Sequence, residues 1–66
     1  MLELDLIFET HLKYFYTNDS QDLQQKFREL LECNDQSLYN WLIARKESAD
    51  DEHKIIVEKI LSRSVT

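Results

Sequence analysis

Few residues in this sequence could carry chemistry: two histidines, one cysteine and several clustered carboxylates. The spacing of His11, Cys33 and His53 matches no zinc motif. The densest acidic run, Asp-Asp-Glu at residues 50–52, is typical of the first turn of a helix, where the helix dipole favours negative charge. General acid–base catalysis needs a carboxylate tied to a histidine, a nucleophile or a positioning turn, and none is apparent. We therefore predict a protein that is not an enzyme and has no metal or cofactor of its own.

Each histidine and the cysteine also has a structural explanation. His53 lies on an apolar helical stripe and His11 at the border of one, so both are expected to be packed, hydrogen-bonded imidazoles. Cys33 follows a predicted helix, and the negative pole of a helix C-terminus disfavours a thiolate. We predict structural roles for all three residues.

The sequence contains neither glycine nor proline in 66 residues. Glycine-rich phosphate loops and glycine C-caps are thereby excluded, and the turns must use Asn, Asp and Ser. This composition favours short connections between helices over β-hairpins. A chain of this length makes one domain at most, so residues 1–66 are expected to form a single helical domain.

Charge and hydropathy limit the kinds of partner. Thirteen acidic and eight basic residues give a net charge of −5, which disfavours nucleic acid as a partner. Residues 30–45 could suggest a DNA-binding helix-turn-helix, but the second helix would be largely apolar with one basic residue, Arg45. A lone thiol, the lack of a leader, and no apolar run approaching about 18 residues predict a cytoplasmic protein without membrane insertion.

Apolar spacing predicts four helices, at about residues 1–16, 21–32, 36–45 and 49–63. Ser20 and Ser48 are the predicted N-caps of the second and fourth helices. The third helix is apolar over more than half of its circumference, so it is expected to be the central, most buried element. The residues assigned to the core are Phe27, Leu31, Leu38, Trp41 and Leu42.

The first predicted helix has two apolar faces. Its main face, expected to turn inward, carries Leu4, Phe8, His11, Leu12 and Phe15. Leu2 and Leu6 point roughly the opposite way at about 100° per residue. This second patch suits either a partner protein or a further helix packed over it, and the sequence leaves both open.

Residues 30–42, LLECNDQSLYNWL, resemble the signature of the SdhE family, the small succinate dehydrogenase flavinylation factors (assembly factor 2 in mitochondria). The shared pattern is Leu-Leu-Glu, Asp35, Leu38, Tyr39 and Trp-Leu. The opening MLELD resembles the part of the family's Arg-Gly-x-x-Glu motif that follows Arg-Gly. Ala-Asp at residues 49–50, followed by an aliphatic helix, resembles the family's last helix. The likeness covers essentially the whole chain.

The resemblance implies an all-α fold. The family has five helices, and the first would precede this sequence, so we expect a small antiparallel helical bundle of four helices. By this correspondence Glu3 stands at the motif glutamate, whereas the arginine and glycine would precede Met1. A late start, a trimmed chain and a degenerate member of the family are all compatible with the sequence. Leu2 and Leu6 would then meet either the missing helix or a client protein.

The resemblance also implies a function. The family binds the flavoprotein subunit of succinate dehydrogenase, and often of fumarate reductase, and promotes covalent attachment of FAD to a histidine of that subunit. This implies an assembly chaperone whose client owns the FAD, with partner contacts at Glu3, Asp5, Leu2 and Leu6. The alternative is a small acidic helical interaction module, such as a regulatory or inhibitory subunit, with a different protein partner. A homodimer is a further possibility, because a missing helix would expose apolar surface.

Overall fold

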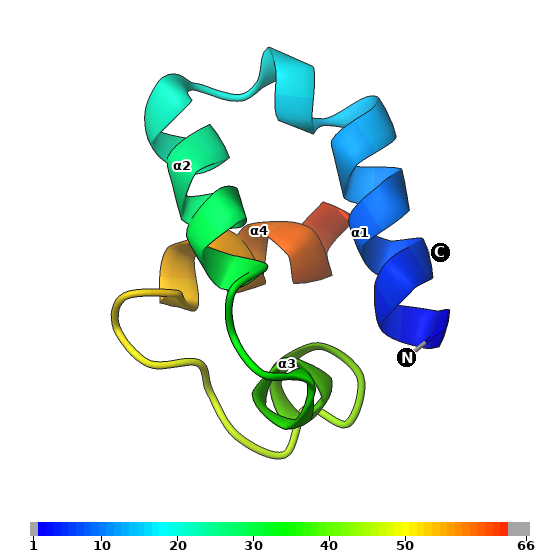
Figure 1. Ribbon diagram of the computed structural model, residues 1–66. Coiled ribbons are helices and arrows are strands. Elements are labelled where there is room, and N and C mark those ends of the chain that lie inside the picture. Colours follow the sequence, from blue (N-terminus) through cyan, green and yellow to red (C-terminus); the bar gives the residue numbers. More distant parts are fainter. Residues whose placement is uncertain (1, 64–66) are drawn as a thin grey trace.

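The computed structural model describes residues 2–63, which are mainly helical (Figure 1). They form α1 (Leu2–Tyr14), a 3-10 turn η1 (Tyr16–Asn18), α2 (Gln21–Leu30), α3 (Asp35–Leu42) and α4 (Lys54–Arg63). No strand is present between residues 2 and 63. The prediction of an all-α bundle of four helices is confirmed.

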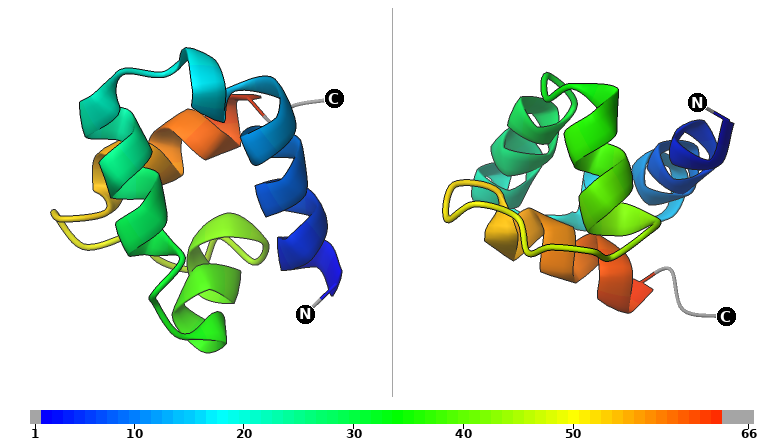
Figure 2. Two further views of the ribbon diagram at one scale, coloured as in Figure 1. Left: turned by 45° about the horizontal axis from the view of Figure 1, so that its top comes forward. Right: turned by 90° about the horizontal axis from the view of Figure 1, so that it is seen from below.

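Helix α4 contacts each of the other three helices. In Figure 1, α1 and α2 run in opposite directions with α4 behind them, and the view from below in Figure 2 shows α4 beneath the other helices. Helix α3 has the largest buried share of the four helices, as expected of the third helix, since Leu38, Trp41 and Leu42 are buried among its eight residues. Part of the apolar circumference of α3 is covered by the irregular segment that follows it, whose Ala49 is buried, rather than by another helix.

Side-chain caps explain where α2 and α3 begin. The hydroxyl of Ser20 accepts a hydrogen bond from the backbone N–H of Leu23 at 3.3 Å, as the sequence predicted. The side chain of Asn34 accepts one from the backbone N–H of Ser37 at 2.8 Å and so caps α3. Both cap residues have an extended backbone that lets the preceding chain leave the helix axis.

The fourth helix begins later than its sequence indicated, at Lys54, and Ser48 does not cap it. Asp50 forms a local turn instead, because its carboxylate accepts hydrogen bonds from the backbone N–H of His53 at 3.2 Å and from Nδ1 of the same residue at 2.6 Å. Aspartate side chains compete with helix formation in this way, by bonding to nearby backbone groups. The acidic run therefore forms a turn ahead of α4, not its first turn.

Helix α3 ends without glycine at a backbone position that glycine usually occupies. The N–H groups of Ile43 and Ala44 both bond to the carbonyl of Tyr39 at 2.9 Å, and Arg45 follows with a φ of 53°. This left-handed conformation is typical of the residue just after a helix. The chain thus uses arginine, not the expected Asn, Asp or Ser, to leave α3.

The core contains side chains from all four helices and from the segment before α4. Its buried apolar residues are Leu4, Phe27, Leu30, Leu38, Trp41, Leu42, Ala49, Ile56, Val57 and Ile60. The assignments of Phe27, Leu38, Trp41 and Leu42 are confirmed, but that of Leu31 is wrong. Leu30 is completely buried, whereas Leu31, about 100° further round, is 46% exposed because none of the described helices covers that side of α2.

Candidate partner-binding surface

The four residues that the sequence assigned to partner binding all lie on the outside of α1. Leu2 is 71% exposed and Leu6 is 56% exposed, and Glu3 and Asp5 are exposed as well. Leu4, in their midst, is buried and holds the helix against the core. No described helix packs over Leu2 or Leu6, so within residues 2–63 this patch is open surface.

Helix geometry brings the two leucines together but separates the two acidic residues. Leu2 and Leu6 are one turn apart and share a face of α1. Glu3 and Asp5 differ by two positions, or about 200° around the axis, so they flank the leucines on opposite sides. A protein bound over Leu2 and Leu6 would therefore meet one carboxylate on each side, not a carboxylate pair.

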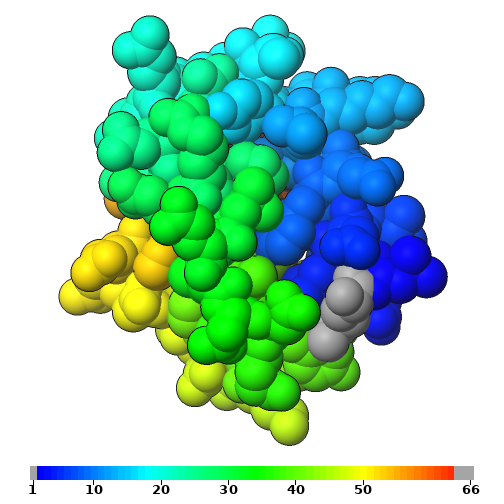
Figure 3. Space-filling model, in the orientation of Figure 1, coloured from blue at the N-terminus to red at the C-terminus, as the bar shows by residue number. Residues whose placement is uncertain are grey.

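A groove between α1 and α2 lies next to this patch and was not predicted from the sequence. Its volume is about 280 Å³. It is lined by Asp5, Phe8, Glu9, Leu12, Phe27 and Leu31. The space-filling view in Figure 3 looks onto this side of the molecule, with α1 in blue and α2 in green. Leu12 was expected to turn inward but is 52% exposed, because α2 meets α1 through Phe27 instead of closing over it.

Three polar residues that were interpreted separately in the sequence are linked by two successive short contacts. Sγ of Cys33 is 3.5 Å from Nε2 of His53, whose Nδ1 is 2.6 Å from the carboxylate of Asp50. A thiol, imidazole and carboxylate in this order can generate a nucleophile. Here, however, burial and the charge of Asp50 raise the pKa of the Cys33 thiol, which keeps it protonated. We assign the group a structural role, joining the end of α2 to the start of α4.

His11 is packed as predicted, but it is not hydrogen-bonded. Its ring stacks on Phe27 with 4.5 Å between centroids, and neither ring nitrogen has a hydrogen-bond partner. Nε2 lies 3.6 Å from the carboxylate of Asp19, which is occupied by Arg63. Burial, reinforced by the charge of Arg63, lowers the pKa of His11, so the ring is held neutral.

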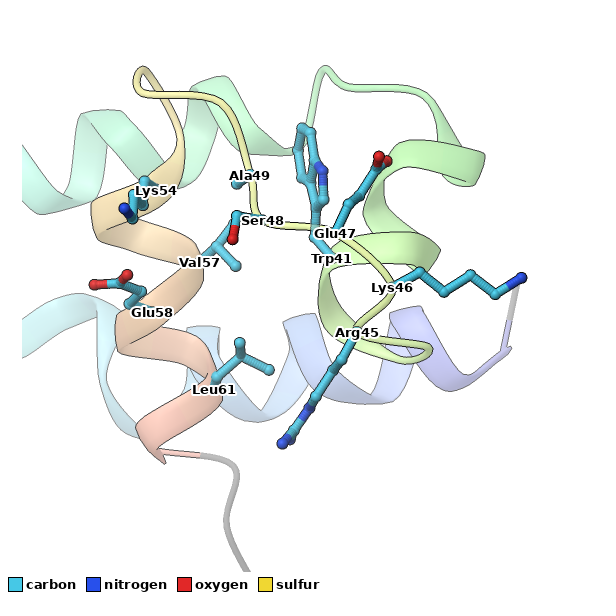
Figure 4. A pocket seen from close by; sticks show the side chains of 10 residues that line it. All are labelled: Trp41, Arg45, Lys46, Glu47, Ser48, Ala49, Lys54, Val57, Glu58 and Leu61. Carbon is cyan, nitrogen blue, oxygen red and sulfur yellow. The ribbon is translucent and has the colours of Figure 1, made fainter.

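A second hollow, of about 330 Å³, lies between α4 and the segment that precedes it (Figure 4). Its lining includes the buried faces of Trp41 and Val57, with Arg45, Lys46 and Lys54 among the charged residues. Figure 4 shows these three basic side chains extending in different directions, not converging on one point. The arrangement does not form an anion-binding site.

Between residues 2 and 63, no group of three or more His, Cys, Asp or Glu side chains could hold a metal ion. None of the helices in this part of the chain has the length and apolar character needed to cross a bilayer.

Comparison with known proteins identifies the family. A family model described as "Flavinator of succinate dehydrogenase" matches residues 1–64. The chain is 36% identical over 63 residues to the FAD assembly factor SdhE of Pseudomonas aeruginosa, covering 96% of this chain and 75% of that protein. It is 39% identical over 64 residues to the protein of the same name from Yersinia pseudotuberculosis, covering 97% of this chain and 73% of the relative. No solved structure matches the chain. The chain therefore belongs to the family of succinate dehydrogenase flavinators, as the resemblance of residues 30–42 predicted.

Proposed function

We propose that this chain is an assembly factor that binds the flavoprotein subunit of succinate dehydrogenase, or of fumarate reductase, and promotes covalent attachment of FAD to it. The observation that carries this proposal is the match of residues 1–64 to the flavinator family. Relatives that are 36% and 39% identical to this chain over the aligned residues are named FAD assembly factors. In this proposal the FAD belongs to the client, and the chain supplies no active site of its own.

The contribution of the chain would be conformational. The bond between flavin and protein forms within the client, so a bound factor accelerates its formation by favouring the client conformation in which the reacting atoms are aligned. Such a factor needs a surface that discriminates between two conformations of its partner, not a catalytic side chain. We expect it to act in the cytoplasm, because a single thiol suits a reducing compartment.

The outer face of α1 has the composition that this contact requires. Leu2 and Leu6 provide an apolar centre of two side chains that water otherwise surrounds. Glu3 and Asp5, on opposite flanks, provide polar contacts at the edge of such an interface. We propose that these four residues contact the flavoprotein subunit.

The test is covalent flavin on the client. The flavoprotein subunit is co-expressed with this chain in a host that lacks its own factor, and flavin fluorescence is read on a denaturing gel. We expect fluorescence with the wild-type chain, and less with a Leu2→Gln, Leu6→Gln double variant or with Glu3→Ala. Ile55→Gln is the matched control, since Ile55 is also an exposed aliphatic residue (54%) but lies on α4.

Two outcomes would count against the proposal. If the wild-type chain produced no covalent flavin on either flavoprotein, the interaction-module alternative with a different partner would replace it. If fluorescence appeared but Glu3→Ala and the leucine variant left it unchanged, the assembly role would stand and the assignment of these residues would be wrong.

A further inference from the structure

The groove between α1 and α2 is bordered by apolar side chains that are exposed to solvent. Leu12 is 52% exposed and Leu31 is 46% exposed, and both border the same hollow. Its floor is Phe27, which is buried and meets the ring of Phe8 edge-on at a centroid distance of 5.9 Å. Contiguous exposed apolar side chains over an aromatic floor are typical of interaction sites on soluble proteins.

One rim of the groove is acidic. Asp5 and Glu9 lie one turn apart on α1, and both line the hollow. Among residues 2–63, neither carboxylate forms an ion pair. Lys13, one turn beyond Glu9, lies over the ring of Tyr14 at 5.3 Å from its centroid. The two carboxylates are therefore available to a cation from another molecule.

We infer that this groove binds an amphipathic helix of the client, with an apolar stripe beside lysine or arginine residues spaced one turn apart. The inference rests on the proposed function and identifies the chemistry of a client segment that would be recognised. A helix fits because grooves between two helices accept the apolar face of a third. The basic residues follow from charge complementarity with Asp5 and Glu9.

The position of the acidic residues explains how this contact would join the one at Leu2 and Leu6. Around the axis of α1, Asp5 and Glu9 lie between Leu12 on one side and Leu2 with Leu6 on the other. The groove and the leucine patch are thus two apolar strips separated by an acidic ridge. A client helix seated in the groove would leave Leu2 and Leu6 free to contact an adjacent part of the same client.

The apolar part of the inference is tested by calorimetric titration of the flavoprotein subunit with the full chain and its variants. A Leu12→Gln, Leu31→Gln double variant should bind at least about tenfold more weakly. Ile55→Gln should bind as the wild type does, because Ile55 is comparably exposed on another helix. Circular dichroism spectra that match the wild type show that each variant is folded.

The charged part is tested with Glu9→Lys, since Glu9 lies in the groove and outside the leucine patch. This variant should weaken binding by several-fold or more, and added salt should weaken binding less than it does for the wild type. Glu58→Lys is the matched control, because Glu58 is an exposed glutamate on α4.

The outcomes separate this inference from the function on which it rests. Wild-type affinity in both the Leu12→Gln, Leu31→Gln variant and the Glu9→Lys variant would overturn the groove assignment and leave the assembly role intact. No binding of the wild-type chain to the flavoprotein would remove the proposed function and the groove assignment together. If sedimentation showed a dimer of the chain that Leu12→Gln, Leu31→Gln dissociates, the occupant would be a second copy and not the client.

Discussion

Arg63, the last residue of α4, donates two hydrogen bonds to the carboxylate of Asp19, which lies 44 residues earlier in the chain. The two N···O distances are 2.8 and 2.7 Å, and the carboxylate side chain is only 6% exposed. The hydrogen bonds lower the pKa of Asp19 and keep it ionised. The pair joins the link between η1 and α2 to the end of α4 and so closes the bundle.

Removing this pair should destabilise the fold. Arg63→Ala leaves a nearly buried carboxylate without its donors, and we expect a loss of about 2 kcal/mol in the free energy of unfolding. This loss can be measured by urea denaturation, with the fluorescence of Trp41 as the signal for unfolding. Arg63→Lys retains the charge without the forked geometry and should lose less. Equal losses in both variants would show that the forked hydrogen-bond geometry, and not the charge, accounts for the stabilisation.

Acidification should destabilise the protein through His11. Because the folded state lowers its pKa, the unfolded chain binds more protons below the ordinary histidine value of about 6.5, and stability falls as the pH drops through that value. Asp19, whose pKa is also lowered, adds a further loss below about pH 4. The urea concentration at the midpoint of unfolding should decrease as the pH is lowered from about 7.5 to about 5.

The His11 assignment has its own control. His11→Phe keeps a ring stacked on Phe27 and should flatten the decrease near pH 6. A decrease that persisted unchanged in His11→Phe would assign the acid sensitivity to another group.

Replacing Arg45 with glycine should stabilise the folded protein. Its φ of 53° costs a residue with a Cβ about 1–2 kcal/mol, part of which glycine recovers after its larger loss of entropy. Arg45→Gly should therefore raise the free energy of unfolding by about 0.5 kcal/mol or more. Ala44→Gly, at a neighbouring position with negative φ, should lower it. A destabilised Arg45→Gly variant would show that the arginine side chain contributes packing that outweighs the strain.

The thiol of Cys33 should react slowly with alkylating reagents. Burial and nearby carboxylates raise its pKa, and only the thiolate is nucleophilic. Iodoacetamide at about pH 8 should modify the folded chain more slowly than the urea-unfolded chain. Asp50→Asn should accelerate the reaction of the folded chain, while Asp22→Asn, in the first turn of α2 at the opposite end from Cys33, should not. A native thiol as reactive as the unfolded one would reopen the nucleophilic interpretation of Cys33 and His53.

The sequence by itself was sufficient for the parts of the fold that depend on local interactions. Apolar periodicity located four helices, and the Ser20 cap follows from a serine three residues before the backbone N–H that it accepts from. The assignment of Phe27 and Trp41 to the core also held, because large side chains at the centre of an apolar stripe have few other places to go. The pattern in residues 30–42 also predicted the family, because it is a contiguous run that can be read without knowing the tertiary structure.

The tertiary structure decided everything that depends on which helix lies against which. Leu30 is buried and Leu31 half-exposed although they are adjacent leucines, since α4 covers one side of α2 and no helix within residues 2–63 covers the other. For the same reason Leu12 borders a groove instead of the core. Periodicity specifies the angle of a side chain around its own helix axis, but burial requires a second helix at that angle. The positions of these second helices follow from contacts between residues far apart in the chain, such as Asp19 and Arg63.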